Sequence, residues 1–159
     1  MRIKKENDIF AYFEIVKELE PENILDAGMF LKRMGSVSRQ MMNQGISEEI
    51  QLYGIDFFPE ISLAAWNNVY DKIYTWQDFL QAKKQYHLGV VLGSGELEKY
   101  RDVGEIIERM RSCCRYLLLG DLPEKYKESM VNFKVQEIKI EGEVYYFVDN
   151  SKEWTSECM

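Results

Sequence analysis

The sequence predicts an α/β protein built on a Rossmann-like, doubly wound sheet, with five parallel strands followed by a C-terminal antiparallel hairpin. Short apolar runs alternate along the chain with segments of helical periodicity. The first two apolar runs end in acidic residues, Asp26 and Asp56, and the last two are joined by Glu141-Gly142. Alternation of strands and helices implies right-handed crossovers and a parallel sheet that is covered on both faces.

The first elements are a helix, a strand and a second helix. Apolar residues repeat at helical spacing over Ile9–Leu19, and Pro21 ends that helix. Ile24–Ala27 is a short apolar run typical of a buried strand. The next helix is expected to begin at Gly35-Ser36, and Gly45 closes it, because glycine favours the left-handed conformation found after helices.

The middle of the chain continues the alternation. Gln51–Phe57 is expected to be the second strand, and a short helix is expected over Glu60–Trp66. Val69–Tyr74 is a third strand, which is less apolar and is therefore expected near a sheet edge. Thr75-Trp76-Gln77-Asp78 has the form of a capping box, which marks the start of the following helix.

The fourth strand, His87–Leu92, is apolar on both faces and is therefore expected at the centre of the sheet. The helix after it carries one apolar stripe, made of Leu97, Tyr100, Val103, Ile106, Ile107 and Met110. Tyr116–Leu119 is the fifth strand, and a short helix is expected from Pro123 to near Met130. Phe133–Ile140 and Val144–Val148 then form a hairpin around Glu141-Gly142.

Size and charge set further expectations. We expect one domain, residues 1–159, with a frayed tail over about residues 150–159. The composition, 46% hydrophobic and 30% charged, is that of a globular protein. A net charge of −7 without a long basic cluster disfavours nucleic acid as a partner, so we expect a small-molecule or protein substrate.

The cysteines and apolar segments indicate a cytoplasmic protein. Cys113, Cys114 and Cys158 match neither a disulfide framework nor a zinc motif, so reduced thiols are expected. No apolar run reaches the roughly 18 residues that span a bilayer, and Met1–Asp8 lacks the apolar segment of a secretion signal. His87 is the only histidine, and no metal site is expected.

The two acidic strand ends are the candidate functional feature. The carboxyl ends of neighbouring parallel strands meet at one edge of an open α/β sheet, where nucleoside-type ligands dock. Asp26 and Asp56 are each expected at such an end, and Gly28 stands where the first chain turns sharply. The pattern therefore predicts a pocket for an adenosine-containing molecule, with an alternative in which both acids only cap the turns that follow.

The layout also resembles that of the class I S-adenosylmethionine (SAM)-dependent methyltransferases, over roughly Ile9–Val148. Ile24–Gly28 looks like the first motif of that family, and Gly54–Phe57 looks like the second. Leu92–Tyr100 is similar to its strand-four segment, and Arg115–Gly120 looks like its fifth strand. The order and spacing of these segments carry the resemblance together.

The resemblance implies a SAM site with S-adenosylhomocysteine (SAH) as the product. In it Asp56 would hold the ribose hydroxyls, Phe57 would lie against adenine and Gly28 would open the cofactor loop. The turn Gly93-Ser94-Gly95 would lie against the methionine part of the cofactor, or it is an ordinary strand-to-helix turn. The candidate cofactor-binding residues are Asp26, Gly28, Asp56, Phe57, Trp76, Gly93 and Ser94.

Two aromatic residues and the glycine loop leave alternatives open. Trp76 and Phe57 would sandwich a base, or both belong to the core. Phe30 and Lys32 stand where the family usually has two further glycines. No catalytic residue can be named.

Three functions are therefore carried forward. The first is methyl transfer from SAM to a small-molecule or protein acceptor. The second is a catalytically inactive, methyltransferase-like binding or interaction module, which Phe30 and Lys32 favour. The third is a nucleotide- or dinucleotide-binding regulatory domain in which Lys32 and Arg33 hold phosphate, although the usual three-glycine fingerprint is missing. The oligomeric state is open, and pairing through the edge of the terminal hairpin is one route to association.

Overall fold

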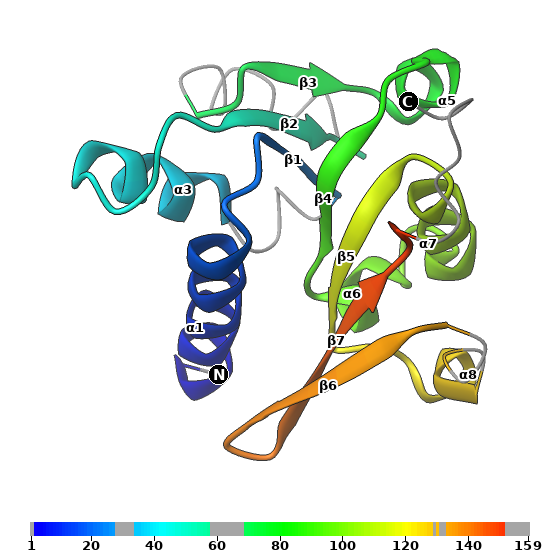
Figure 1. The fold of residues 1–159 in the computed structure, drawn as a ribbon. Coiled ribbons are helices and arrows are strands. Elements are labelled where there is room, and N and C mark those ends of the chain that lie inside the picture. The colour runs from blue at the N-terminus through cyan, green and yellow to red at the C-terminus, as the bar shows by residue number, and fades with distance from the viewer. Residues whose placement is uncertain (1, 28–33, 58–68, 129, 131–132, 152–159) are drawn as a thin grey trace.

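A computed structural model describes residues 2–27, 34–57, 69–128, 130 and 133–151. Its strands form one sheet in the order β3-β2-β1-β4-β5-β7-β6 (Figure 1). The strands are β1 (Asn23–Asp26), β2 (Gln51–Ile55), β3 (Lys72–Tyr74), β4 (Tyr86–Val91), β5 (Cys114–Gly120), β6 (Val135–Ile140) and β7 (Glu143–Asp149). The helices are α1 (Arg2–Leu19), α3 (Met34–Asn43), α5 (Trp76–Gln81), α6 (Ser94–Leu97), α7 (Val103–Arg111) and α8 (Glu124–Lys127).

The predicted fold class is confirmed. Strands β3, β2, β1, β4 and β5 are parallel, and β7 runs antiparallel to both β5 and β6. The weakly apolar β3 lies at one edge of the sheet, as its composition predicts. The strongly apolar β4 lies inside the sheet, and its Leu88 and Val90 are fully buried.

Helices cover both faces of the sheet, as a doubly wound fold requires. In Figure 1, α1 and α3 lie on one face, and α5 and α7 lie on the other. Alternate residues of a strand belong to the two hydrophobic cores, one on each face of the sheet, because successive side chains of a strand point to opposite faces. Ile24 and Leu88 belong to the core under α1 and α3, whereas Leu25 and Leu117 belong to the core under α5 and α7.

The first helix is longer than predicted, and it presents a different stripe to the core. It begins at Arg2, and its Phe10, one of the apolar residues in the predicted helical repeat, is 54% exposed. Ala11, Tyr12 and Val16 are buried instead. A repeat of apolar residues does not mark Tyr12 as a core residue, because tyrosine carries a polar hydroxyl. In the fold this hydroxyl is buried with a hydrogen-bond partner, Ser38 of α3.

The N-terminal half of α1 is tied to the C-terminal hairpin. The side-chain amide of Asn7 donates to the carbonyl oxygen of Ile140 over 3.4 Å. The hydroxyl of Tyr145 on β7 donates to Asp8 Oδ1. Asn7, Asp8 and Tyr145 are buried, and Ile140 is half-buried. These two hydrogen bonds therefore join the first helix to the last hairpin of the fold.

The helix expected after the fourth strand is two helices, and this corrects the prediction of one continuous stripe. Helix α6 ends early, Tyr100 is 57% exposed, and α7 begins at Val103. A new helix begins at Val103 because two carboxylates cap its N-terminus. Asp102 Oδ1 accepts from the amide of Gly104 over 2.9 Å, and Glu98 Oε2 accepts from the amide of Val103 over 2.8 Å.

Removing the first of these caps tests that explanation. We expect Asp102→Ala to destabilise the protein more than the control does, because it removes the N-cap and the acceptor of the Tyr126 hydroxyl. Urea denaturation measures the free energy of unfolding of each variant. Glu108→Ala is the matched control on the same helix, because it removes an exposed ion pair with Arg111 that contributes only about 0.3 kcal/mol. Equal stability of the two variants would contradict the capping role.

Two predicted turns are confirmed. Gly45 has φ of +72° and ends α3, and the amide of Ile46 donates back to the carbonyl of Met41 over 2.9 Å. The hairpin turn Glu141-Gly142 has φ of 49° and 85°, the signs of a two-residue type I′ turn. The capping box of α5 is confirmed in its first half, because Thr75 Oγ1 accepts from the amide of Asp78 over 3.1 Å.

The described cysteines are free thiols. Cys114 is fully buried at the start of β5, and Cys113 is half-buried beside it. Cys158 and the predicted helix over Glu60–Trp66 lie outside the described residues. In the described part of the chain, no helix has the length and apolar character that crossing a membrane requires.

Candidate functional site

The two acidic strand ends lie at the same edge of the sheet. Strands β1 and β2 pair in parallel with Asp26 beside Gly54, and Asp56 follows two residues later. Strand β4 pairs with the other side of β1 and places Val90 beside Asp26. The side chains of Asp26 and Asp56 are 3% and 1% exposed. The prediction that Asp26 and Asp56 lie at the carboxyl ends of adjacent parallel strands is confirmed.

Asp26 has a tyrosine partner that the sequence pattern does not reveal. The hydroxyl of Tyr70 donates to Asp26 Oδ2 over 2.6 Å and accepts from the amide of Gly35 over 3.2 Å. Burial and the neighbouring carboxylate raise the pKa of Tyr70 well above its ordinary value, so this hydroxyl keeps its proton. It therefore links the end of β1 to the first turn of α3.

Gly35 is required by the position of the Tyr70 ring. A Cβ at this residue would lie 2.5 Å from Tyr70 Cζ and 2.7 Å from its hydroxyl oxygen. The helix can approach the tyrosine closely only because glycine has no side chain. The sequence marks Gly35 as a helix start, and its contact with Tyr70 explains why a glycine occurs there.

A second buried tyrosine extends this network. The hydroxyls of Tyr12 and Ser38 are hydrogen-bonded to each other, and both residues have no exposed surface. Burial raises the pKa of Tyr12, and the charge of Asp26 raises it further. Asp26 thus lies among protonated hydroxyls, an environment that suits a buried carboxylate.

Asp56 leaves the sheet with its backbone still paired. Its amide donates to the carbonyl of Tyr74 over 2.8 Å, which extends the contact between β2 and β3 past the end of β2. The side chain is almost completely buried. The backbone position of Asp56 is therefore fixed by the neighbouring strand.

Phe57 and Trp76 lie in direct contact, which differs from the predicted sandwich. Their ring centroids are 5.8 Å apart at an interplanar angle of 37°, so a base has no space between them. Trp76 also packs on Phe79 and belongs to the core. The guanidinium carbon of Arg101 lies 5.0 Å from the Trp76 ring and 5.6 Å from the Phe57 ring, a cation–π arrangement.

The turn after β4 is tightly packed. Gly93 has φ of 76° and precedes α6, and the buried hydroxyl of Ser94 donates to the carbonyl of Val91 over 3.3 Å. A Cβ at Gly95 would lie 2.6 Å from Asp121 Oδ2, so this turn contacts the segment that follows β5. Gly93 and Ser94 therefore lie at the predicted edge, with the hydroxyl of Ser94 turned to its own backbone.

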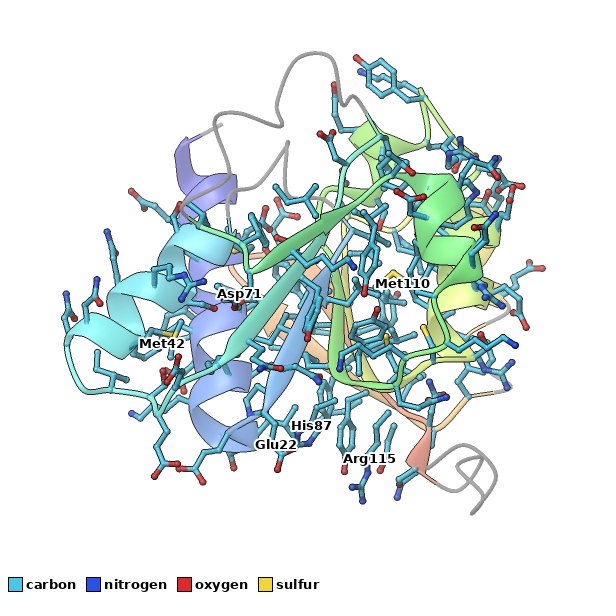
Figure 2. The ribbon with its side chains drawn as sticks, turned by 90° about the horizontal axis from the view of Figure 1, so that it is seen from above. Glu22, Met42, Asp71, His87, Met110 and Arg115 are labelled. Atoms are coloured by element: carbon cyan, nitrogen blue, oxygen red, sulfur yellow. The ribbon has the colours of Figure 1, made fainter. Side chains whose placement is uncertain are left out.

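Some predicted positions are elsewhere or undescribed. Gly28, Phe30, Lys32 and Arg33 lie outside the described residues, so their roles stay predictions. His87 lies near the amino end of β4, where Figure 2 shows it between Glu22 and Arg115. That is the opposite edge of the sheet from Asp26 and Asp56. Among the described residues, no group of three or more His, Cys, Asp or Glu side chains is placed to hold a metal.

Sequence reasoning missed Tyr70 and Arg101. Tyr70 falls in the run predicted to be the third strand, but it precedes β3 and turns its hydroxyl to Asp26. Arg101 lies between α6 and α7, a break that the predicted continuous helix conceals. The one sequence signal for Tyr70 is that a buried tyrosine hydroxyl needs a polar partner. We find no sequence signal for the position of Arg101.

The comparisons with known proteins agree with this geometry. No family model matches the chain, and no curated protein is significantly similar to it. Among solved structures, magnesium protoporphyrin IX methyltransferase from Synechocystis PCC 6803 with bound SAM aligns at a TM-score of 0.61 and 15% identity, covering 92% of this chain and 79% of that one. The O-methyltransferase TomG from Streptomyces achromogenes, in complex with SAM, gives 0.59 and 11%, covering 89% and 78%.

A putative SAM-dependent methyltransferase from Methanococcus maripaludis gives a TM-score of 0.54 and 12% identity, covering 89% of this chain and 84% of that one. Identities this low establish the fold alone. The chain therefore has the fold of the class I SAM-dependent methyltransferases.

Proposed function

We propose that the protein binds SAM and SAH at the edge formed by the carboxyl ends of β1, β2 and β4. The observation that carries the proposal is the pair of buried acids, Asp26 and Asp56, at the ends of two adjacent parallel strands. This is the position at which open α/β sheets take nucleoside ligands. Two of the structural neighbours were solved with SAM, which supports the same ligand class.

The residues at this edge suit the cofactor's polar groups. The Asp56 carboxylate would accept hydrogen bonds from both hydroxyls of a ribose, because an ionised carboxylate offers two acceptor oxygens. Such bonds are strengthened by the charge and by burial. Phe57, half-buried beside Asp56, would offer its ring to adenine, and Arg101 would have to move or to stack on the base from the other side.

We propose methyl transfer to a small-molecule or protein acceptor as the reaction. When bound, SAM supplies an electrophilic methyl group on a sulfonium. The chain's contribution would be positioning and exclusion of water, which accelerate a bimolecular step without a catalytic cluster. A net charge of −7 disfavours a nucleic-acid acceptor.

Ligand-induced stabilisation tests the proposal. We expect SAM and SAH to raise the melting temperature, and NAD and ATP to leave it unchanged, because only a ligand that binds the folded state stabilises it. Asp56→Asn is expected to weaken SAH binding at least tenfold, about 1.4 kcal/mol, by isothermal titration. The control is Asp78→Asn, the same change on the exposed surface of α5, which should leave binding unaltered.

A second function is favoured by one observation. The Asp26 carboxylate and the Gly35 amide already share the Tyr70 hydroxyl, so these groups are satisfied within the chain. A methyltransferase-like module that binds a partner and no cofactor would have this arrangement. The absence of a melting shift with SAM, SAH, NAD and ATP would support this reading, and a shift with NAD or ATP alone would favour a nucleotide-binding regulatory domain; either result would overturn SAM binding.

A further inference from the structure

Strand β6 ends the sheet with a row of polar backbone groups. It is the last strand in the sheet order, and within the described residues its only neighbour is β7 (Figure 1). Exposed strand edges are templates for pairing with another chain, and proteins usually interrupt them with proline, bulges or charges. Val135–Ile140 contains no proline, and its pairing with β7 is regular along its whole length, so of these devices the strand has only charged side chains, Glu137 and Lys139.

The type of hairpin turn determines which residues of β6 direct their backbone N–H and C=O groups away from β7. In a two-residue hairpin the flanking residues, here Ile140 and Glu143, form a mutually hydrogen-bonded pair. Hydrogen-bonded and non-bonded pairs alternate along an antiparallel ladder. The backbone groups of Gln136, Ile138 and Ile140 therefore face β7, and those of Glu137 and Lys139 face outward from the sheet.

The sequence of β6 is complementary to itself in one register. Consider two copies that pair antiparallel through this edge about a twofold axis normal to the sheet, so that facing side chains share a face. When the axis passes through Ile138, Glu137 of each copy lies opposite Lys139 of the other. The neighbouring registers centre on residue 137 or 139, and they place Glu137 or Lys139 opposite itself. Opposite charges stabilise such cross-strand pairs and like charges destabilise them.

The same register joins the outward backbone groups correctly. Glu137 and Lys139 are the residues that would exchange amide–carbonyl hydrogen bonds, and Ile138 at the axis would form a non-hydrogen-bonded pair. Both charged side chains are exposed, and neither forms an ion pair among the described residues. Backbone pairing therefore permits this register and its neighbours centred on residues 137 and 139, and the side-chain charges select this one among them.

An apolar groove borders this edge on the α1 side. A groove of about 380 Å³ lies between α1 and the hairpin; half-buried Ile15, Leu19, Ile138 and Phe147 form its apolar part, and exposed Glu14, Glu18 and Gln136 complete its lining. Ile138 belongs both to this groove and to the proposed axis. Contact between the two copies of Ile138 would bury apolar surface that the single chain leaves partly exposed.

We propose that β6 is a self-association surface, and that its occupant is the β6 strand of a second copy, antiparallel and centred on Ile138. Two seven-stranded sheets then continue as one. The interface is small, because it rests on one short strand from each copy, so we expect a concentration-dependent, reversible dimer.

Charge reversal tests the register. Sedimentation equilibrium over a range of protein concentrations should show a monomer–dimer equilibrium for the wild type. Lys139→Glu should weaken dimerisation at least tenfold, because it creates two Glu–Glu pairs, and Glu137→Lys should do the same with two Lys–Lys pairs. The double variant E137K/K139E restores both opposite-charge pairs and should return the dissociation constant to within about threefold of the wild type.

Cross-linking provides a readout that does not depend on charge. In a Cys158→Ser background, Ile138→Cys places two cysteines across the axis at a Cα separation of about 4.5 Å, which suits a disulfide. Gln136→Cys is the control, because its two copies would be offset by four residues, about 13 Å. A wild type that stays monomeric, a charge swap that fails to restore association, or equal cross-linking of both variants would overturn the proposal.

Discussion

Gly35→Ala is expected to lower the free energy of unfolding by about 2–4 kcal/mol, the sum of overpacking and a lost buried hydrogen bond. The new methyl group would lie 2.5 Å from Tyr70 Cζ, where an atom cannot be placed without movement of the ring. The ring cannot move away without giving up the bond from its hydroxyl to Asp26. The neighbouring β1 end would then hold a carboxylate with one partner fewer.

Urea denaturation followed by tryptophan fluorescence measures the Gly35 effect. Ser36→Ala, one position further along the same helix, adds no atom and is expected to change stability by at most about 0.5 kcal/mol. If both variants are equally stable, then Tyr70 does not occupy the position described. The Tyr70→Phe variant separates the two contributions, because it removes the hydrogen bonds without crowding the helix.

Tyr145→Phe is expected to lower the free energy of unfolding by about 2–3 kcal/mol, the cost of removing a hydrogen bond from a buried charged group. Tyr145 is 1% exposed and its hydroxyl donates to Asp8, which is also buried. Removing one oxygen atom leaves the packing intact, so the loss isolates this bond. Tyr146→Phe is the matched control, because the Tyr146 hydroxyl forms no hydrogen bond within the described residues.

The same variant should alter the stability of the protein in alkali. Burial and the carboxylate of Asp8 raise the pKa of Tyr145 above its ordinary value, so the folded state favours the protonated hydroxyl. This contribution is complete below the unfolded-state pKa, about 10, and is lost as the pH rises above it. Tyr145→Phe should therefore lose stability less steeply than the wild type above about pH 10. Parallel curves for the two proteins would contradict the linkage.

The positions of Asp26 and Asp56 follow from local sequence together with a general rule. Each ends an apolar run, and parallel strands place their carboxyl ends at one edge. No rule of that kind identifies Tyr70 as the partner of Asp26, because the two residues are 44 positions apart and the contact depends on the path of the intervening chain. Long-range polar pairs of this kind are invisible to periodicity.

The errors have a common physical origin. Phe10 and Tyr100 are aromatic and fit an apolar helical spacing, yet both are exposed. At Tyr100 the cause is local: the carboxylates of Glu98 and Asp102 read as ordinary helix-surface charges, but they cap a new helix. Arg101, which lies against the rings of Phe57 and Trp76, is placed in that same break.

The hydrogen bonds that join Asn7 and Asp8 to the terminal hairpin have a consequence for synthesis on the ribosome. The surface of α1 that they occupy stays incomplete until Ile140 and Tyr145 have been translated, more than 130 residues after Asn7 and Asp8. Strand β1 also waits, because both of its neighbours, β2 and β4, are made later. A nascent chain of this protein would therefore expose the apolar surfaces of α1 and β1 for most of its elongation. Chaperones that bind such surfaces would have access to them throughout that time.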